Sequence, residues 1–240
     1  MLPSKGYILG SVSFRRAAWV CAFFGFLVFA TGLAMELYAP FKGAKDWKHP
    51  PLVRPGLALQ LPVSMAEVEA MVAGVETVAI RRLEWDYFFI LSYAFFFASL
   101  AVVHFRQKAP HWKPLAVFTL FFTATTVVLD VMENLHLADV VLGGAAPDLV
   151  ISGLKWFSFF TVMLLSAPIY VRRVRWPFVI GAALVFFATL GMIGCVGLLV
   201  TTASRAVIAV ALDLTLITTL VGLGVLFRPL PLLPPTAIAD

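Results

Sequence analysis

Charged residues are scarce in this chain of 240 residues, since Asp, Glu, Lys and Arg together make up 13%. Soluble domains average about a quarter charged residues and about half apolar ones, whereas 61% of the residues here are hydrophobic. This composition excludes a soluble globular enzyme, a disordered chain and a nucleic-acid-binding module. We therefore expect an integral membrane protein with no nucleic-acid partner, and we attribute the formal net charge of +5 to basic residues that set its orientation in the membrane.

Cysteine is also scarce, and the motifs of several enzyme classes are missing. Cys21 and Cys195 both lie in long apolar runs, where Cys packs as a small hydrophobe, and no C-x-x-C is present. The histidines form no H-x-x-x-H or H-E-x-x-H pattern, which argues against a zinc hydrolase. Walker-type, G-x-G-x-x-G and G-x-S-x-G sequences are absent too. We expect no metal and no cofactor, and the sequence assigns no catalytic residue.

Six apolar stretches are each long enough for a transmembrane helix, which needs about 20 mostly apolar residues. They cover residues 17–38, 83–105, 114–136, 149–171, 176–200 and 206–227. All are too long and too continuous for the strands of a membrane barrel, which alternate weakly over about 10 residues. The sequence predicts an all-α integral membrane protein, a six-transmembrane-helix bundle that forms a single membrane domain over residues 1–240.

Acidic residues are nearly missing from one side of this predicted bundle. With the N-terminus in the cytoplasm, the inner side carries ten basic residues and one acid, Asp240. The basic residues are Lys5, Arg15, Arg16, Arg106, Lys108, Lys113, Arg172, Arg173, Arg175 and Arg228. Short cytoplasmic loops rich in Lys and Arg are typical of membrane proteins. We predict an N-in/C-in, multi-pass protein of the plasma (inner) membrane.

The first apolar stretch has a second interpretation, as a cleaved signal peptide. Three basic residues precede it, and residues 32–34 (Gly-Leu-Ala) resemble a small-residue cleavage site. The stretch is long for a signal peptide, and Glu36 and Tyr38 make an unusual junction. We therefore expect it to remain as the first span.

One connection, residues 39–82, is long and divides into two parts. Residues 39–63 hold five prolines and predict an extended, irregular chain. At Ser64 an S-x-x-E capping pattern leads into apolar residues at helical spacing, which predicts one amphipathic outer-surface helix over residues 64–82. This helix either rests in the membrane interface or forms a lid over an outer cavity.

Polar side chains line one face of the third predicted span. A spacing of 4, 3, 4 and 3 residues keeps them on one helical stripe. They are Thr119, Thr123, Thr126, Asp130 and Glu133, and Asn134 follows directly. An ionisable group at the centre of a span costs about 2.5–3.5 kcal/mol on insertion scales and usually pairs inside the protein. The two carboxylates therefore need partners.

Lys155 is the predicted partner of these carboxylates. It lies six residues after Leu149 in the fourth span, about 9 Å below the outer end at ~1.5 Å per residue. The connection between the third and fourth spans is short, which makes them antiparallel neighbours. Lys155 is thus at the right depth to meet Asp130 or Glu133.

Two further carboxylates belong to the same outer half of the membrane. Asp86 begins the second span, with Tyr93 two turns deeper on the same face, and Asp213 lies roughly 10 Å into the sixth span at the same rise. We predict six ligand-binding residues: Asp86, Asp130, Glu133, Asn134, Lys155 and Asp213.

This outward-facing polar site is consistent with three functions. The first is a protein that binds or transports a small cation, a zwitterion or a lipid headgroup. The second is an accessory or assembly subunit of a larger membrane complex, in which the ion network is purely structural. The third is an intramembrane enzyme that acts on an outer-leaflet lipid, with one carboxylate as acid or base. A closed network without a cavity would favour the second, and a cavity that reaches the carboxylates would favour the first or third.

Overall fold

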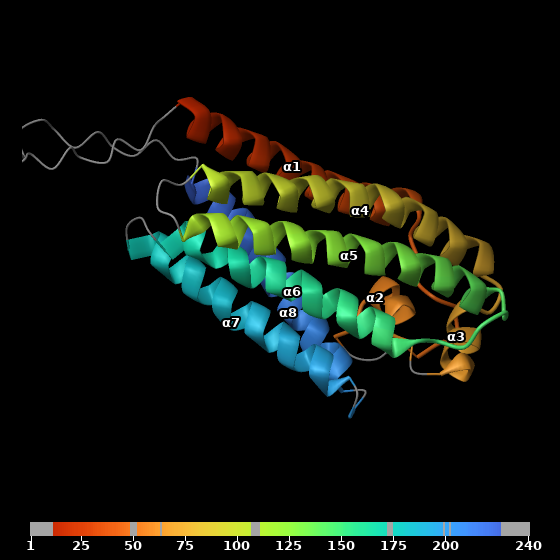
Figure 1. Cartoon of the computed structure of the whole chain (residues 1–240). Helices are drawn as coiled ribbons and strands as arrows, with labels where there is room; N and C mark the ends of the chain where they lie inside the picture. Colours follow the sequence, from red (N-terminus) through yellow and green to blue (C-terminus); the bar gives the residue numbers. More distant parts are fainter. Residues whose placement is uncertain are drawn as a thin grey trace, which may run out of the picture.

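A computed structural model describes residues 12–48, 52–62, 64–106, 111–171, 175–198, 200–201 and 203–226. These residues form eight helices and no strand (Figure 1). The helices are α1 (Val12–Tyr38), α2 (Pro55–Gln60), α3 (Met65–Val72), α4 (Glu76–Phe105), α5 (Trp112–Val141), α6 (Leu149–Val171), α7 (Arg175–Gly197) and α8 (Ser204–Leu226).

Six of the helices are long and apolar enough to cross a membrane, namely α1, α4, α5, α6, α7 and α8. They coincide with the six predicted spans, so the prediction of an all-helical chain with six spans is confirmed. α4 begins at Glu76, ahead of the predicted residue 83, and α5 continues to Val141, beyond the predicted residue 136. Helical hydrogen bonding continues into the polar turns that flank each apolar run, because it does not depend on side-chain polarity.

The long helices pack as neighbours in the order α1, α4, α5, α6, α7, α8. The six helices do not close into a ring, because α1 and α8 barely contact each other. The short helices α2 and α3 lie at one end of the bundle, which we call the capped end (Figure 1). The α5–α6 connection lies at the capped end. The C-terminus of α4 and the N-terminus of α5 lie at the opposite end, as expected for alternating spans.

The predicted helix over residues 64–82 is wrong in its extent. The structure ends α3 at Val72 and starts α4 at Glu76, so the second half of the predicted helix is the first part of the second span. Gly74 adopts a left-handed conformation (φ 74°) that breaks the helix, and its amide donates to the Glu76 carboxylate (3.0 Å). The predicted Ser64 cap is confirmed, since the Ser64 hydroxyl accepts from the Glu67 amide.

The predicted irregular segment, residues 39–63, contains the short helix α2, although its five prolines predicted no helix there. Pro55 occupies the first turn of α2, where its missing N–H is not needed. Leu57, Ala58 and Leu59 of this helix are buried. Pro50 and Pro51 lie outside the described residues.

Arginines join the capped end to the long helices. Arg205 at the start of α8 donates to the Glu67 carboxylate of α3 (2.8 Å) and to the Leu61 carbonyl (3.1 Å). Arg82 of α4 donates to Glu36 at the end of α1 and to the Ala39 carbonyl. The capped end is therefore attached both to α8 and to the α1–α4 pair.

Close packing of α6 on α7 makes one glycine sensitive to substitution. A Cβ added to Gly191 would lie 2.4 Å from the Phe160 ring, which is fully buried and cannot move outward. We expect Gly191→Ala to lower the free energy of unfolding by about 1–3 kcal/mol, because overpacking a tight contact costs that much. The measurement is unfolding in mixed detergent micelles.

Gly153→Ala on α6 is the matched control for this prediction, because its added Cβ would meet its nearest atom only at 4.0 Å. We expect this control to leave the free energy of unfolding unchanged or to raise it, since Ala is the better helix former. Equal losses in the two variants would contradict the close-packing argument.

Candidate functional site

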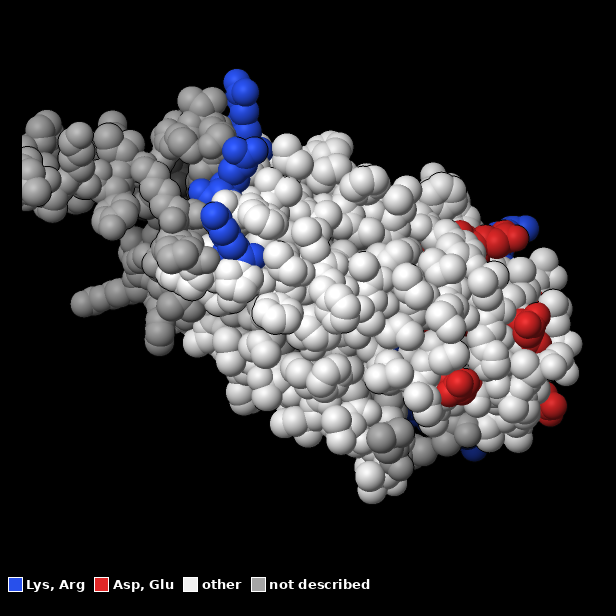
Figure 2. Space-filling model, viewed as in Figure 1, with Lys and Arg blue, Asp and Glu red and all other residues white. Residues whose placement is uncertain are grey.

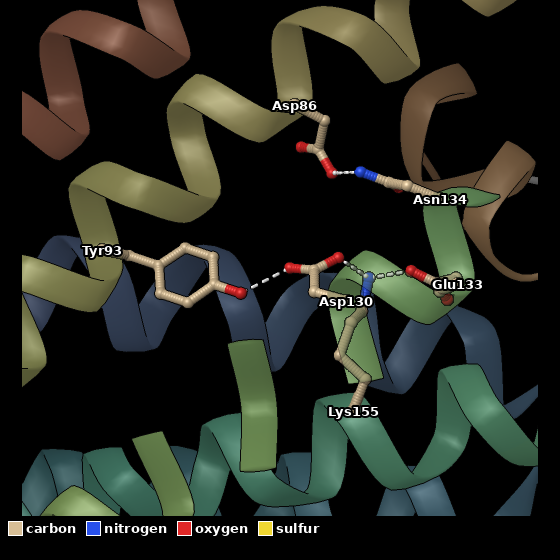
Figure 3. A network of polar contacts seen from close by, with 6 residues as sticks. All are labelled: Asp86, Tyr93, Asp130, Glu133, Asn134 and Lys155. Atoms are coloured by element: carbon tan, nitrogen blue, oxygen red, sulfur yellow. Dashed lines mark hydrogen bonds and ion pairs between the residues drawn. The ribbon is translucent and has the colours of Figure 1, made fainter. Parts of the chain in front are cut away.

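Three neighbouring helices bring six polar side chains together inside the bundle (Figure 3). α4 supplies Asp86 and Tyr93, which are seven residues apart and therefore on one face. α5 supplies Asp130, Glu133 and Asn134, and α6 supplies Lys155. We call these six residues the polar network.

Lys155 lies at the centre of the polar network and is 2% exposed. Its Nζ donates to Asp130 Oδ1 (3.1 Å) and forms a second, very close ion pair with Glu133. The ammonium also lies over the Trp156 ring, 4.5 Å from the ring centroid. The predicted pairing of Lys155 with the third-span carboxylates is confirmed.

The remaining contacts of the network run between α4 and α5. The Tyr93 hydroxyl donates to Asp130 Oδ2 (2.6 Å), and the Asn134 amide donates to Asp86 Oδ2 (2.8 Å). Asp130 thus receives one donor from α4 and one from α6. These contacts tie three spans together, as expected for buried polar groups.

The threonines of the polar stripe do not join the network. Thr119, Thr123 and Thr126 are buried as predicted, but each hydroxyl donates to the backbone carbonyl four residues earlier in α5. This local bond satisfies the hydroxyl within its own helix. The carboxylates are held by Lys155, Tyr93 and Asn134 instead.

Asp213 is the one predicted ligand residue that the structure does not bring to the network. Its side chain is 48% exposed and forms an ion pair with Arg54, the residue before α2. α8 packs mainly on α7 and not on α5, so Asp213 is not brought to the network. The depth of Asp213 in its helix matched the network, but its position around the bundle did not.

A cavity of about 510 Å³ adjoins the polar network. Asp86, Tyr93, Asp130 and Lys155 line it, whereas Glu133 and Asn134 do not. Residues 54–57 and 59–60 of the α2 segment line it near the capped end. Apolar side chains from α1, α4, α6 and α8 line most of the rest, together with Glu36, Lys42, Arg82, Thr126 and Thr219. Of the two short helices, α2 lines the cavity. α3 does not line it, and its apolar residues Val68, Met71 and Val72 are buried in the protein.

Within the described part of the chain, no three His, Cys, Asp and Glu side chains are placed to hold a metal ion together. The three carboxylates of the network are instead spread around Lys155 and Asn134 (Figure 3). The geometry suits hydrogen bonding and ion pairing to a ligand that enters the cavity.

Comparison with protein families, curated proteins and solved structures found no match for the chain.

Sequence reasoning missed several residues around the site. Tyr93 was placed on the face of Asp86 by its spacing, but it was not counted among the six predicted ligand residues. Arg54 had no signal in the sequence, because its contact depends on how an aperiodic segment folds back over the bundle. Arg82 had none either, because its contact with Glu36 depends on how α1 and α4 pack. The apolar cavity wall also had none, since lipid-facing and cavity-facing apolar residues look alike in a sequence.

Proposed function

We propose that this protein binds an amphiphilic molecule dissolved in the membrane. The polar head of the ligand lies at Asp86 and Asp130, and its apolar part follows the cavity between α1, α4, α6 and α8. Of the ligands that the sequence left open, the lipid-like one fits this space best.

The observation that carries the proposal is the cavity of about 510 Å³, which is mostly apolar beside the network residues Asp86, Asp130 and Lys155. Its other charged lining residues lie towards the capped end and are Glu36, Lys42, Arg54 and Arg82. Ligand cavities are typically about 300–1,000 Å³, mostly apolar, with a few polar groups that fix orientation, and they occur between the helices of bundles. Phe96, Phe97 and Met163 line the apolar part. A hydrocarbon chain gains from burial there, while the network holds the head.

The gap between α1 and α8 supports entry from the lipid phase. These two helices barely contact each other, although both line the cavity. Phe29 and Leu33 of α1 and Leu220 of α8 line the cavity and are also exposed on the bundle surface. An amphiphile can therefore reach the polar network laterally from the lipid phase, without passing through the capped end.

We further propose that the chain is oriented N-in/C-in, with the capped end outside the plasma (inner) membrane. The acidic side chains visible in Figure 2 gather at the capped end, and basic side chains dominate the opposite end. Positive charge at the cytoplasmic ends of spans supports this orientation. Five of the ten basic residues counted inside, and Asp240, lie outside the described residues: Lys5, Lys108, Arg172, Arg173 and Arg228.

One observation favours a structural role for part of the network, as expected of an accessory subunit. Glu133 pairs with Lys155 and does not line the cavity. We assign this pair to holding α5 on α6, and we assign Asp86 and Asp130 to the ligand. The cavity beside the network favours ligand binding over a purely structural function, and among the described residues no specific contact favours catalysis on a lipid.

The test is photolabelling of the purified protein in lipid nanodiscs with three twelve-carbon probes. Each probe carries a diazirine at the tail end, and the heads are an ammonium, a hydroxyl and a phosphate. We expect at least one probe to label the peptide that contains Met163, which lines the cavity and is fully buried. Label confined to surface residues would contradict the proposal.

Leu216→Trp is expected to reduce that labelling about tenfold, because the larger ring fills the cavity beside α8. Ile217→Trp is the matched control, since the neighbouring side chain is 57% exposed and does not line the cavity. Thermal unfolding of both variants shows whether each is folded. Equal labelling of the two folded variants would show that the probe does not occupy the cavity.

A further inference from the structure

We propose that the head of the ligand is an ammonium group that donates hydrogen bonds to Asp86. This inference rests on the proposed binding of an amphiphile and specifies its chemical class as a long-chain amine. Five features of the site carry it: the engaged donors, a free acceptor, the excess of carboxylates in the network, the paired charges near the capped end and the aromatic wall.

The donor groups of the polar network are already directed at its own carboxylates. Tyr93 donates its hydroxyl proton to Asp130, and Asn134 donates to Asp86. Lys155 donates to two carboxylates, with the Trp156 ring beside its ammonium. The indole nitrogen of Trp156 is enclosed by protein atoms. A head that needs donors, such as a phosphate or a carboxylate, finds them occupied.

The hydrogen-bonding position that the polar network leaves unused is an acceptor oxygen. Asp86 is 5% exposed and lines the cavity, and one of its oxygens accepts from Asn134. Among the described residues its other oxygen has no hydrogen-bond partner, and protein atoms do not enclose it. Figure 3 shows this oxygen directed away from Asn134. A buried carboxylate oxygen that faces a cavity calls for a donor from the ligand.

The charge balance of the network also favours a cation. The network contains three carboxylates, from Asp86, Asp130 and Glu133, but one ammonium, that of Lys155, which pairs with Asp130 and Glu133. A cationic head in the cavity offsets the excess negative charge, whereas an anionic head adds to it.

The arginines that line the cavity towards the capped end do not reverse this balance. Arg82 is paired with Glu36, and Arg54 is paired with Asp213. Lys42 also lines the cavity but is exposed, so water screens its charge. The unbalanced charge that the ligand meets inside the bundle is therefore negative.

Aromatic side chains form much of the wall beside Asp86 and Asp130. They are Phe89, Tyr93, Phe96, Phe97, Trp156 and Phe159. Aromatic ring faces attract cations within about 6 Å, and this attraction is strongest where water is excluded. The wall therefore suits an ammonium as well as the alkyl carbon next to it.

The three photolabelling probes test the head class separately from the proposed function. We expect the ammonium probe to label the Met163 peptide about tenfold more than the hydroxyl or phosphate probe at equal concentration in the bilayer. Equal or stronger labelling by the hydroxyl or phosphate probe would overturn the ammonium assignment while leaving the amphiphile function intact. Failure of all three probes to label the cavity would overturn both.

Asp86→Asn tests the acceptor directly. We expect labelling by the ammonium probe to fall about tenfold, to the level of the hydroxyl probe, while hydroxyl labelling is unchanged because the cavity keeps its shape. Glu84→Gln removes the same charge from an exposed position two residues away and should leave the ammonium preference intact. An unchanged preference in Asp86→Asn would overturn the inference.

Loss of labelling by the hydroxyl probe would reveal that the Asp86→Asn variant does not fold. Competition on the unmodified protein tests the inference in that case. Unlabelled dodecylamine should displace the ammonium probe at about one tenth of the concentration that dodecanol requires. Displacement by both compounds at the same concentration would count against an ammonium head.

Discussion

Lys155→Met is expected to lower the free energy of unfolding by about 3–5 kcal/mol, the usual cost of removing one partner of a buried ion pair. The ammonium contacts both Asp130 and Glu133, and all three side chains are buried. Methionine fills a similar volume but leaves these buried carboxylates without their cation. Unfolding in mixed detergent micelles, followed by circular dichroism, measures the loss.

Lys113→Met is the matched control for this prediction. It removes the same charge with the same side chain, but Lys113 is exposed near the start of α5. Surface substitutions usually change stability by less than about 0.5 kcal/mol. Similar losses in the two variants would mean that Lys155 is not held by its partners.

The double variant Lys155→Met with Glu133→Gln tests whether the pair is coupled. Neutralising Glu133 removes one of the charges that the first substitution leaves unpaired, so we expect the double variant to be more stable than the sum of the single losses predicts. Groups that contact each other commonly show interaction energies of about 0.5–3 kcal/mol. Strict additivity of the two losses would exclude the coupling.

The polar network was largely predictable because helix geometry is regular. The spacing of Asp130 and Glu133 places them on one face, and a short connection makes α5 and α6 antiparallel neighbours. The depth of Lys155 then follows from the rise per residue. Each step uses only the regular geometry of a single helix and one short connection between two helices. Both can be recognised in the sequence.

The position of Asp213 was not predictable in the same way. Its depth in α8 matches the network, but depth does not say which helices a residue faces. That depends on how six helices are arranged around the bundle, which many apolar contacts decide together. Its partner Arg54 comes from a segment whose path has no periodic pattern to reveal it.

The break between α3 and α4 shows a different limit. The apolar spacing from Met65 to Ala79 continues smoothly through Gly74, so periodicity alone predicts one helix. Gly74 ends α3 by adopting a left-handed conformation, which a glycine permits but does not require. The cavity is a related case, because a space between helices is a property of packing and leaves no pattern in any single helix.

Asp130→Asn is expected to lower the free energy of unfolding by about 1.5–3 kcal/mol, the value of a hydrogen bond to a charged group. Asp130 accepts from Tyr93 on α4 and from Lys155 on α6, so it joins three helices. Asparagine retains the size of the side chain and one acceptor oxygen, but it removes the charge that Lys155 needs. Its new N–H₂ group also has to face either the Tyr93 hydroxyl or the Lys155 ammonium.

Asp148→Asn is the comparison that makes this prediction specific, because it is the same chemical change at a different carboxylate. Asp148 is exposed just before α6, and its carboxylate accepts from the Val150 amide (2.8 Å). Asparagine caps a helix about as well as aspartate, so the loss should stay below about 0.5 kcal/mol. Unfolding of both variants under identical detergent conditions gives the difference directly. If Asp130→Asn were as harmless as Asp148→Asn, Asp130 would not be a buried acceptor between three spans, and the head-binding role assigned to the network would lose its structural basis.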